Sequence, residues 1–471
     1  MSLDLKGPAG LSEPIAGKAQ LIDYFRGAEK PRGEWKVGVE HEKIGIVDGT
    51  YQAVPYYGDN GIRCILDALA RDAGGSQHAH RENGQPIAVL KEGASVTLEP
   101  GGQLELSGAP HRTLRAARDE IERHLAVLRG ISRQRGVRWL AAGYRPFGSR
   151  DEVPWMPKGR YAAMRKSLGP RGRLALDMML MTATVQANLD WSDERDLAEK
   201  VRAASSASPI VSALFANSSV IAGRDGGYLD FRYQVWRETD PDRCGLLEPM
   251  FRDGWGYEAY VDWALGVPML FVRRGTEYLD ARGQTFGDWM RTGRLRAGGI
   301  AAPALGNWVD HLTTLFPEVR VKRVLELRGA DMVPPPYLHA LAAIWVGLLH
   351  DPAARDAAWE LTKGWSFAQR LEFQGDVARR ALDAQGPGGR TARDLARELL
   401  FAARAGLSAW AAESGDELRG ALDPLEDVIA RGTLAERALV VLQEARGDPA
   451  ALVRFWQIAE SPADRATLRF S

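Results

Sequence analysis

The chain of 471 residues carries 61 basic and 61 acidic side chains, and this balance argues against nucleic acid or an anionic membrane as its dominant partner. Hydrophobic residues make up 45% of the chain and charged residues 26%, which is typical of a globular protein with a large buried core. The two cysteines, Cys64 and Cys244, are too few for a disulfide scaffold or a Cys-rich zinc site. The N-terminus shows no basic segment followed by an apolar stretch, and the longest apolar run, residues 338–349, is too short to cross a bilayer. We therefore expect a soluble protein of the reducing cytoplasm.

After a loose, Gly- and Pro-containing lead-in over residues 1–34, the segment 36–46 alternates its side chains as a half-buried strand does. In that alternation Glu40 and Glu42 point to one face, whereas His41 and the neighbouring valines point to the other. Two adjacent carboxylates repel each other and lose hydration, which is unfavourable unless a multivalent cation lies between them. Magnesium prefers such an all-oxygen environment. The strand therefore predicts a magnesium site, and we interpret His41 as a structural histidine.

Helices and short strands are expected to alternate over the following hundred or so residues. The helices are indicated by apolar residues at helical spacing, and the strands by short apolar runs between turn residues. A Pro-Gly-Gly turn joins the last two strands of the first group. In chain order, the expected elements are a helix at 19–26, a helix at 61–72, strands at 87–90, 95–98 and 103–106, a helix at 113–135 and a strand at 139–142.

Beyond residue 150 the sequence passes from a loop-rich region to a helical C-terminal part. Residues 151–173 are rich in Pro, Gly, Lys and Arg, and residues 241–256 are loop-like. A strand at 180–189 would carry Gln186 and Asn188 on one face. The other expected elements are a helix at 203–215, an alternating strand at 319–327, and helices from residue 337 to the end that break at 385–389 and near Gly415 and Gly447.

Carboxylates recur on strand-like segments, between apolar neighbours. A single Glu in such a place more often faces solvent, but five of them favour one shared site. Several carboxylates on one sheet face would bind more than one Mg²⁺ ion, and magnesium with ATP phosphates is the usual apparatus of phosphoryl transfer. The sequence has neither a Walker loop nor a Gly-x-Gly-x-x-Gly turn, so a nucleotide would be held in another way. The five residues are Glu40, Glu42, Glu99, Glu105 and Glu326.

Cationic and amide side chains complete the candidate site. Most basic residues are expected at the solvated surface, but an arginine beside an aromatic residue or in a Gly-flanked loop is suited to grip a carboxylate or a phosphate. Arg165 and Arg232 are the preferred candidates for that role. Gln186 and Asn188 could complete a magnesium shell with neutral oxygens or could cap backbone groups, and the residues alone support both alternatives equally.

A series of further motifs runs in order along most of the chain. They are GVEHEK at 38–43, LEPGGQLELSGAP at 98–110, MPKGRY at 156–161, LDMM at 176–179, TVQANLD at 184–190, ALFANS at 213–218, HLTTLFPEVR at 311–320, RGAD at 328–331 and WVGLL at 345–349. In this series the chain resembles the plant and proteobacterial type of glutamate–cysteine ligase, the first enzyme of glutathione synthesis. Ordered motifs over so much of the chain make the resemblance specific.

The resemblance implies an α+β fold of the glutamine-synthetase type, in which helices surround a curved, mainly antiparallel sheet, with a helical C-terminal part. We expect a single catalytic domain over residues 1–471, made of the lead-in, a sheet-based core at 35–336 and a helical part at 337–471. In the implied reaction, ATP phosphorylates the side-chain carboxylate of glutamate, and the amino group of cysteine then attacks the γ-glutamyl phosphate to give γ-glutamylcysteine. Glutamate, cysteine, ATP and Mg²⁺ would be the partners, with no nucleic acid and no membrane.

Carried over to this sequence, the resemblance also implies roles for individual residues. The magnesium ligands would be Glu40, Glu42, Glu99, Glu105, Gln186 and Glu326. Arg165 and Arg232 would hold amino-acid carboxylates, and Trp236 would form a wall of the substrate pocket or pack in the core. Lys322 and Arg328 would bind the nucleotide and neutralise charge on the transferred phosphoryl group.

Two departures from the family pattern leave alternatives open. Plant members carry a regulatory cysteine shortly after the Ala-Pro motif, but this chain has Arg118 there, so a plant-like disulfide switch is not expected. After Asp331 the chain reads MVPPPY at 332–337 instead of Gly-Gly-Pro-Trp-Arg-Arg, and a γ-glutamyl ligase for another amine is therefore a second hypothesis. A non-catalytic sensor that binds glutamate or nucleotide is a third, although an acidic cluster is costly to keep without a metal.

Overall fold

A computed structural model of the chain describes residues 11–281, 283–298, 302–416 and 418–458. At the centre of this described part lies a nine-stranded sheet with the order β14-β15-β7-β1-β5-β4-β3-β2, and β6 pairs with the far end of β1. All of its strand pairs are antiparallel. The strands are β1 (Val37–Val47), β2 (Ala79–Glu82), β3 (Gln85–Lys91), β4 (Ala94–Leu98), β5 (Leu104–Ser107), β6 (Val137–Leu140), β7 (Val185–Leu189), β14 (Val319–Val321) and β15 (Leu325–Leu327).

The long strand β1 organises the sheet because it is paired along both of its edges. Towards β5 it places Glu42 opposite Glu105, and towards β7 it places Glu40 opposite Gln186. Residues directly opposite each other in an antiparallel pair point to the same side, so these four polar side chains share one face. The buried valines of β1 and His41 point to the other face, as the sequence alternation predicts.

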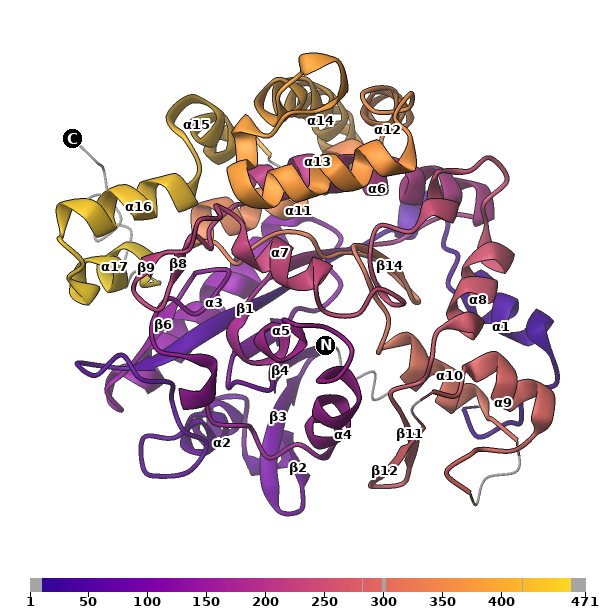
Figure 1. Ribbon diagram of the computed structural model, residues 1–471, viewed down its shortest axis with the longest axis horizontal. Coiled ribbons are helices and arrows are strands. Elements are labelled where there is room, and N and C mark those ends of the chain that lie inside the picture. The colour runs from indigo at the N-terminus through magenta and orange to yellow at the C-terminus, as the bar shows by residue number, and fades with distance from the viewer. Residues whose placement is uncertain (1–10, 282, 299–301, 417, 459–471) are drawn as a thin grey trace.

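Helices pack around this sheet (Figure 1). Helix α3 packs on β1 and β6, α11 packs on β7, and α2 packs on β3. The side chain of Lys43 on β1 meets His124 of α3 at 3.0 Å, so α3 lies on the face opposite to the carboxylates. The helices are α1 (Lys18–Arg26), α2 (Ile62–Asp72), α3 (Leu114–Arg133), α4 (Gly159–Leu168), α5 (Ala175–Met181), α6 (Glu194–Leu214), α7 (Phe231–Arg237), α8 (Tyr257–Gly266), α9 (Phe286–Thr292), α10 (Leu305–Leu312), α11 (Pro335–Leu349), α12 (Pro352–Glu360), α13 (Phe367–Arg380), α14 (Ala392–Ser414), α15 (Asp423–Arg431), α16 (Leu434–Glu444) and α17 (Pro449–Trp456).

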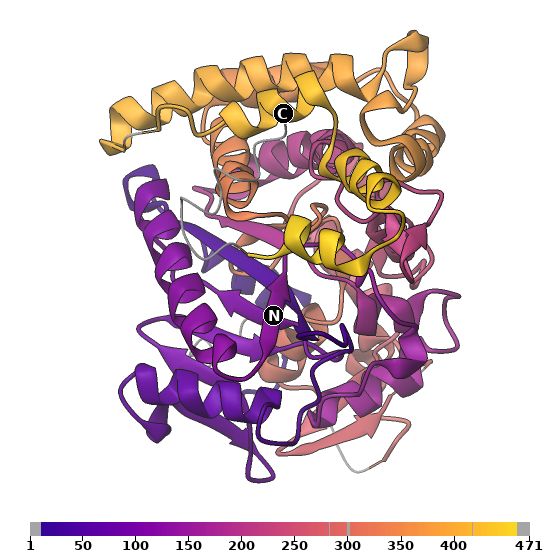
Figure 2. The same cartoon turned by 90° about the vertical axis from the view of Figure 1, so that its left-hand side faces the viewer.

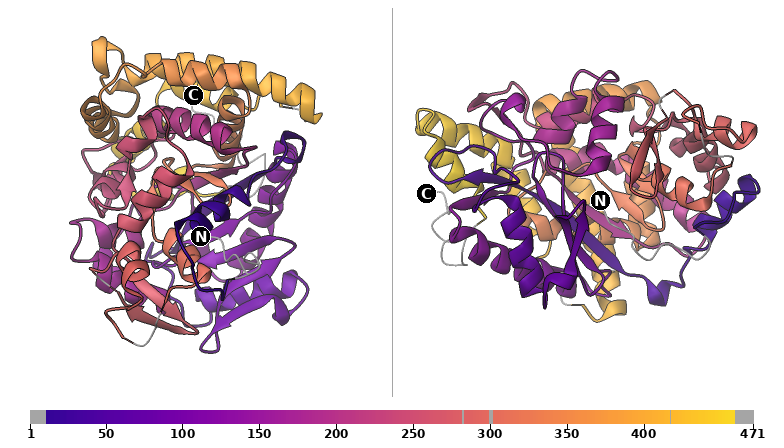
Figure 3. Two further views of the ribbon diagram at one scale, coloured as in Figure 1. Left: turned by 90° about the vertical axis from the view of Figure 1, so that its right-hand side faces the viewer. Right: turned by 90° about the horizontal axis from the view of Figure 1, so that it is seen from below.

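The helical C-terminal part predicted from the sequence is confirmed. α11 packs on β7 and β1, and α14 packs along α11. α14 ends at the predicted break, where Gly415 takes the left-handed conformation with φ of 70°. Figures 1 and 2 show these helices together along one side of the molecule, above the sheet. Figure 3 shows α1 at the end of the molecule opposite to α16 and α17.

Three local predictions differ from the structure. The strand predicted at 180–189 is the end of α5 followed by β7, which begins only at Val185. The run Met-Met-Leu-Met at 178–181 is apolar at every position, so periodicity cannot separate a buried helix from a buried strand there. The Pro- and Gly-rich region 151–173 contains α4, and the strand predicted at 319–327 is a hairpin of β14 and β15.

The predicted fold class, α+β with a mainly antiparallel sheet and a helical C-terminal part, is confirmed. One large hydrophobic core contains residues of the sheet and of the C-terminal helices. This is in keeping with a single domain, and the division of the chain into domains stays a prediction. Residues 1–10 of the predicted lead-in and residues 459–471 lie outside the described residues. None of the described helices is long and apolar enough to cross a membrane. Short two-stranded ladders join β8 (Val220–Ile221) to β9 (Arg224–Asp225), β10 (Cys244–Gly245) to β13 (Phe316–Pro317) and β11 (Phe271–Arg274) to β12 (Glu277–Asp280).

Candidate active site

A cavity of about 620 Å³ lies over the polar face of the sheet. Strands β1 and β7 contribute to its floor, and α4, α5 and α7 contribute to its walls. The sheet therefore presents its polar face to this cavity, whereas its apolar face is packed against helices. Six of the residues predicted from the sequence line this cavity, and they are Glu42, Glu99, Gln186, Arg232, Trp236 and Arg328.

Glu99 reaches the cavity because the chain turns tightly after β4. The N–H of Gly102 donates to the carbonyl oxygen of Glu99 at 2.9 Å, and Gly102 has a φ of 81°, which favours glycine. A side chain at position 101 would collide with the carbonyl group of Leu180 at the end of α5. The Pro-Gly-Gly turn of the sequence thus holds Glu99 close to α5.

Of the carboxylates on the polar face, Glu40 and Glu105 are buried, Glu42 is half-buried, and neighbouring donors hold them. The backbone N–H of Thr184 donates to Glu42 at 3.1 Å. The hydroxyl of Thr97 on β4 donates to Glu105 at 2.9 Å, across the register that pairs these two residues. Glu40 and Glu105 are only 2% and 0% exposed, so these acids are removed from bulk water. The strand pairing, rather than any single loop, brings them together.

This cluster carries more negative charge than its surroundings neutralise. Burial raises the pKa of Glu42 to about 8, and the charges of Glu99 and Glu105 act in the same direction. Burial also raises the pKa of Glu40. A bound cation with oxygen ligands would relieve this cost. Within the described residues, however, no three His, Cys, Asp or Glu side chains lie close enough together to hold a metal ion. The shared face is confirmed, and the metal site stays a prediction.

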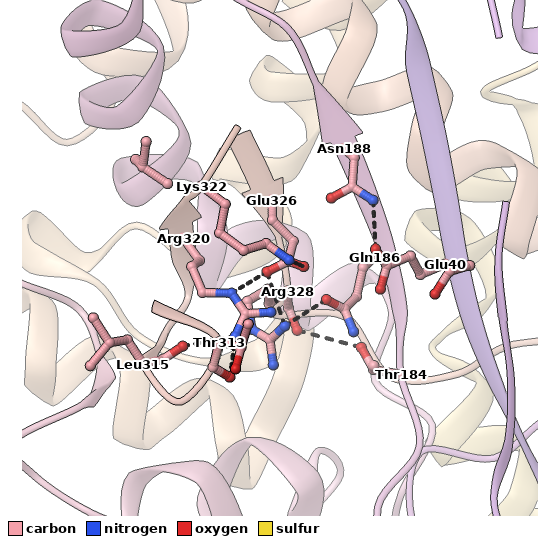
Figure 4. Close-up of polar contacts among 12 residues, drawn as sticks. Glu40, Thr184, Gln186, Asn188, Thr313, Leu315, Arg320, Lys322, Glu326 and Arg328 are labelled. Carbon is pink, nitrogen blue, oxygen red and sulfur yellow. Dashed lines mark hydrogen bonds and ion pairs between the residues drawn. The ribbon is translucent and has the colours of Figure 1, made fainter. Parts of the chain in front are cut away.

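Glu326 on β15 is surrounded by cations instead of by carboxylates (Figure 4). Arg320 forms an ion pair with it, Lys322 Nζ lies 3.0 Å from its Oε1 atom, and Arg328 Nη1 lies 3.1 Å from its Oε2 atom. Burial acts to raise the pKa of Glu326, but these three charges hold that pKa well below its usual range. Both carboxylate oxygens are engaged in ion pairs, so this geometry does not favour the predicted role of Glu326 as a magnesium ligand.

Two amides of β7 lie between the cations and the carboxylates (Figure 4). Arg328 Nη1 donates to Gln186 Oε1 at 2.8 Å. Asn188 Nδ2 donates to Glu40 Oε1 at 2.9 Å. The oxygen of Gln186 that was expected to bind magnesium accepts a hydrogen bond from arginine in this structure, so Gln186 orients a cation here.

Arg232 and Trp236 come from α7 and form the wall next to Arg328. Arg232 is 1% exposed and donates to the carbonyl oxygens of Arg328 at 3.1 Å and of Gly329 at 3.0 Å. The guanidinium carbons of Arg232 and Arg328 lie 5.8 and 5.7 Å from the centre of the Trp236 ring. At these distances an aromatic face attracts both cations. Trp236 therefore lies at the cavity wall, one of the two places that the sequence left open for it.

Arg165 lies apart from this cluster. It is an exposed residue of α4, and its guanidinium carbon is 4.8 Å from the centre of the Trp155 ring. It lines a second, more open cavity of about 1250 Å³ together with Lys158. Tyr161 lines both cavities, so the two spaces are neighbours. The structure brings Arg232, but not Arg165, together with the other predicted cations.

Sequence reasoning missed the buried cation Arg320, and it counted Lys158 among basic residues expected mostly at the solvated surface. Arg320 is 1% exposed, lines the cavity and pairs with Glu326. Its signal was strand parity, because Arg320 and Lys322 are two residues apart in one alternating run. Lys158 is 6% exposed, and burial lowers its pKa to about 8, although the charge of Glu99 acts in the opposite direction. A lysine between Pro and Gly gives no such signal in the sequence.

Comparison with known proteins identifies the family of the chain. The sequence profile of glutamate–cysteine ligase family 2 (GCS2) matches residues 36–454. Glutamate–cysteine ligase B, chloroplastic, of Oryza sativa subsp. japonica is 39% identical over 437 residues, which are 93% of this chain and 86% of the rice protein. The chloroplastic glutamate–cysteine ligases of Medicago truncatula and Arabidopsis thaliana are each 39% identical over 430 residues, which are 91% of this chain and 82% and 80% of those proteins.

Two solved structures are similar over most of the chain, but only distantly. The glutamate–cysteine ligase of Francisella tularensis, solved in complex with AMP, aligns with a TM-score of 0.49 and 13% identity over 92% of this chain and 91% of that one. The complex of the prokaryotic ubiquitin-like protein Pup with its ligase PafA aligns with a TM-score of 0.43 and 9% identity over 95% of this chain and 77% of that one. At these scores neither structure carries an argument about the site.

The plant relatives overturn the expected cytoplasmic location. All three are chloroplastic by name, so these relatives contradict the cytoplasmic prediction, which is wrong. Its physical basis was too weak, because a low cysteine count indicates a reducing compartment without saying which one. Since the family profile spans residues 36–454 and the relatives share 39% identity over more than nine-tenths of the chain, the chain belongs to glutamate–cysteine ligase family 2.

Proposed function

We propose that this protein is an ATP-dependent ligase that joins the γ-carboxylate of glutamate to the amino group of cysteine. The main support is one cavity lined by the carboxylates Glu42 and Glu99 and by the cations Arg320 and Arg328, with Gln186 of β7 beside Arg328. The names of the relatives, glutamate–cysteine ligases over most of the chain, support the choice of substrates. The product is γ-glutamylcysteine, made in the first step of glutathione synthesis.

The chemistry needs two transfers, because a carboxylate is a poor acyl donor. In the first, an oxygen of the glutamate γ-carboxylate attacks the γ-phosphorus of ATP, and ADP leaves. In the second, the cysteine nitrogen attacks the acyl carbon of the γ-glutamyl phosphate, phosphate leaves, and the nitrogen loses a proton. Phosphoryl transfer depends chiefly on positioning and on stabilisation of charge, and these are what buried ionic groups on a rigid sheet provide.

Glu40, Glu42, Glu99 and Glu105 are the residues that would hold Mg²⁺. Their donor set is made of oxygens alone, and burial, together with the charges of Glu99 and Glu105, raises the pKa of Glu42 to about 8, so a cation with oxygen ligands fits there. When bound, the metal would supply positive charge to the ATP phosphates. These carboxylates would approach that ion from two adjacent strands and one turn, although no three of them lie within metal-binding distance of one another in the described part of the chain.

Lys322 and Arg328 are proposed to stabilise the negative charge of the transferred phosphoryl group, and Arg320 joins them. Fixed cations in a water-poor cavity stabilise developing charge at little cost of reorganisation. Glu326 has the role of holding these three cations in place through its ion pairs. Gln186 has the role of orienting Arg328 through the 2.8 Å hydrogen bond.

Arg232 is proposed to bind an amino-acid carboxylate, with Trp236 as the adjoining wall. Its guanidinium group is planar and suited to a carboxylate, and it already lines the cavity with two backbone carbonyls as anchors. Arg165 could bind substrate only from the second, open cavity, across Tyr161. We also propose that the sheet-based core and the helical part act as one catalytic domain.

A different amine acceptor finds no support in the residues that prompted the idea. Met332 and Val333 are fully buried, and α11 begins at Pro335. No residue of 332–337 is among the described residues that line the cavity. The unusual segment after Asp331 therefore has a packing role at the start of a helix, and cysteine is kept as the proposed acceptor.

The test is ADP release by the purified protein with glutamate and Mg-ATP, with and without cysteine, followed by mass analysis of the product. We expect ADP release that depends on cysteine and a product with the mass of γ-glutamylcysteine. Release with another amine but not with cysteine would refute the acceptor. Absence of release with every amine tested would refute the ligase and leave the sensor hypothesis.

A further inference from the structure

Two buried aspartates lie side by side behind the cavity wall. Asp230 is the residue that precedes α7, and Asp331 ends the segment that follows β15. Both side chains are 0% exposed, and two consecutive residues hold them together, because Asn217 N–H donates to Asp331 Oδ2 at 2.8 Å and Ser218 Oγ lies 3.5 Å from Asp230 Oδ1. Neither residue is among the metal-binding carboxylates or the cations assigned above, so the proposed chemistry leaves them without a role.

The other contacts of this pair are specific. Asp230 Oδ1 accepts from the backbone N–H of Tyr233 at 2.8 Å, which caps α7. Asp331 Oδ2 accepts from the backbone N–H of Asn217 at 2.8 Å. The remaining oxygens, Asp230 Oδ2 and Asp331 Oδ1, are buried and have no hydrogen-bond donor in the described part of the chain. Oxygens of two neighbouring carboxyl groups can form a hydrogen bond only when one of them carries a proton.

We propose that Asp230 and Asp331 share one proton, and that this pair of a carboxylic acid and a carboxylate positions Arg232 and Arg328 in the active site. The role of the two arginines rests on the proposed ligase function. The sharing of the proton does not, because it concerns only the two carboxyl groups and their surroundings.

The pair connects the two segments that carry these arginines. Asp230 fixes the start of α7, and Arg232 follows two residues later with its own N–H donated to Ser218 Oγ at 3.1 Å. Asp331 fixes the end of residues 328–331, whose first two carbonyl oxygens accept from the Arg232 guanidinium group. A hydrogen bond between Asp230 and Asp331 therefore closes a ring of contacts around Arg232.

The space around the pair leaves it no other arrangement. A side chain at position 143 would overlap the carboxyl group of Asp331, so Gly143 lets the backbone pack directly on it. On the other side, Ser218 Oγ lies 3.5 Å from Asp230 Oδ1. Because both residues are buried, a change in their charge is not compensated by direct contact with water.

Electrostatics support a shared proton at neutral pH. Burial raises the pKa of Asp331 to about 6, and burial together with the charge of Asp331 raises the pKa of Asp230 well above its usual range. The charged side chain that acts on both is Arg232, which lowers both values and balances the single negative charge of the pair. Two such coupled groups lose their protons in separate steps, so one proton is retained between them.

The first test is a cycle of asparagine substitutions, followed by the thermal midpoint of the full chain. In Asp230→Asn, the amide oxygen keeps the bond from Tyr233 and the amide NH₂ donates to Asp331, so the midpoint should change little at acidic pH, where wild type retains the shared proton at least cost. The midpoint of Asp331→Asn should also change little, because the amide NH₂ at position 331 then donates to Asp230. The double variant places two NH₂ groups against each other, and its midpoint should fall by more than the sum of the single changes. Additive changes, or single variants as unstable as the double one, would overturn the shared proton.

The second test uses pH. A carboxyl group whose pKa is raised by folding contributes stability below its unfolded pKa and loses it as pH rises through the folded pKa. The midpoint of Asp230→Asn relative to wild type should therefore rise from roughly pH 5 to 9. Asp240→Asn is the matched control, because Arg171 and Arg243 hold the pKa of Asp240 below its usual range although burial acts the other way. Its difference from wild type should stay constant over that range. Parallel profiles for both variants would contradict the proposal.

The positioning role has a kinetic readout. In the double variant the ring around Arg232 opens, so KM for glutamate should rise by about tenfold while each single variant stays near wild type. A double variant that loses stability but keeps the wild-type KM would refute the positioning role. If wild type shows no ligase activity while the asparagine cycle and the pH profile behave as expected, the proposed function fails and the shared proton stands.

Discussion

Replacing Glu326 by glutamine should destabilise this protein more than most single substitutions can. Glu326 is 0% exposed and its one carboxylate serves Arg320, Lys322 and Arg328. Removing one partner of a buried ion pair costs about 3–5 kcal/mol, because the remaining charge stays buried without compensation. Here three cations would be left, of which Lys322 and Arg328 are 14% and 12% exposed and can regain some water. We therefore expect the free energy of unfolding to fall by about 3–5 kcal/mol. Native proteins are usually stable by about 5–15 kcal/mol, so this loss is a large part of the total and nearly all of it in a marginally stable protein.

The assay is urea unfolding followed by tryptophan fluorescence, which the 14 tryptophans of the chain make sensitive. Glu258→Gln is the matched control, since Glu258 pairs with Lys18 at 2.6 Å but its side chain is 67% exposed. That pair is screened by solvent, and its loss should leave the unfolding midpoint unchanged. Combining Glu326→Gln with Arg320→Met should recover part of the loss, because one unpaired cation is removed. A midpoint for Glu326→Gln equal to that of Glu258→Gln would refute the network, and restoration of its activity by excess Mg²⁺ would favour the metal-ligand role instead.

Further predictions concern the carboxylates and the substrate-binding arginines. Glu42→Gln should lower ADP release by about 100-fold or more without lowering the unfolding midpoint, and wild-type activity in this variant would remove Glu42 from the metal site. In metal-free protein, burial raises the pKa of Glu42 to about 8. Wild type should therefore lose stability relative to Glu42→Gln as pH rises towards and through that value, and Mg-ATP should reduce this loss of stability. Parallel melting profiles of the two proteins over this pH range would contradict the prediction. Arg232→Lys should raise KM for glutamate by about tenfold, because the planar bidentate group is lost. Arg165→Ala, at an exposed site, should change this KM by less than about fivefold. Equal effects of the two variants in steady-state kinetics would refute this ranking.

The sequence was a good guide wherever a side chain's direction followed from strand parity. Glu40 and Glu42 were placed on one face of a strand, and the structure has both there, with His41 on the other. Parity could also have found Arg320, which precedes Lys322 by two residues, had the hairpin of β14 and β15 been recognised. Local alternation thus predicts which residues share a face, because the strand period is fixed by backbone geometry.

Partners across the sheet could not be read from the sequence in the same way. Glu326 looked like the other carboxylates because it lies between two leucines, yet its neighbours across the hairpin are cations. Arg165 looked suited to bind a substrate, but α4 directs it to the surface beside Trp155. Which side chains meet depends on strand order and register between segments up to about three hundred residues apart, and no single segment encodes that.

The strand order on the polar face separates the cations that surround Glu326 from the carboxylates of β1 and β5. Arg320 stands on β14, Lys322 and Arg328 directly follow β14 and β15, and the neutral amides of β7 lie between them and β1. Neighbouring strands are about 4.8 Å apart, so β15 and β1 are separated by roughly 10 Å. A phosphate tail in this space would meet metal-binding acids on one side and fixed cations on the other. A charged side chain in place of Gln186 or Asn188 would pair with one of the two groups, and the neutrality of β7 is therefore what keeps both available to substrate.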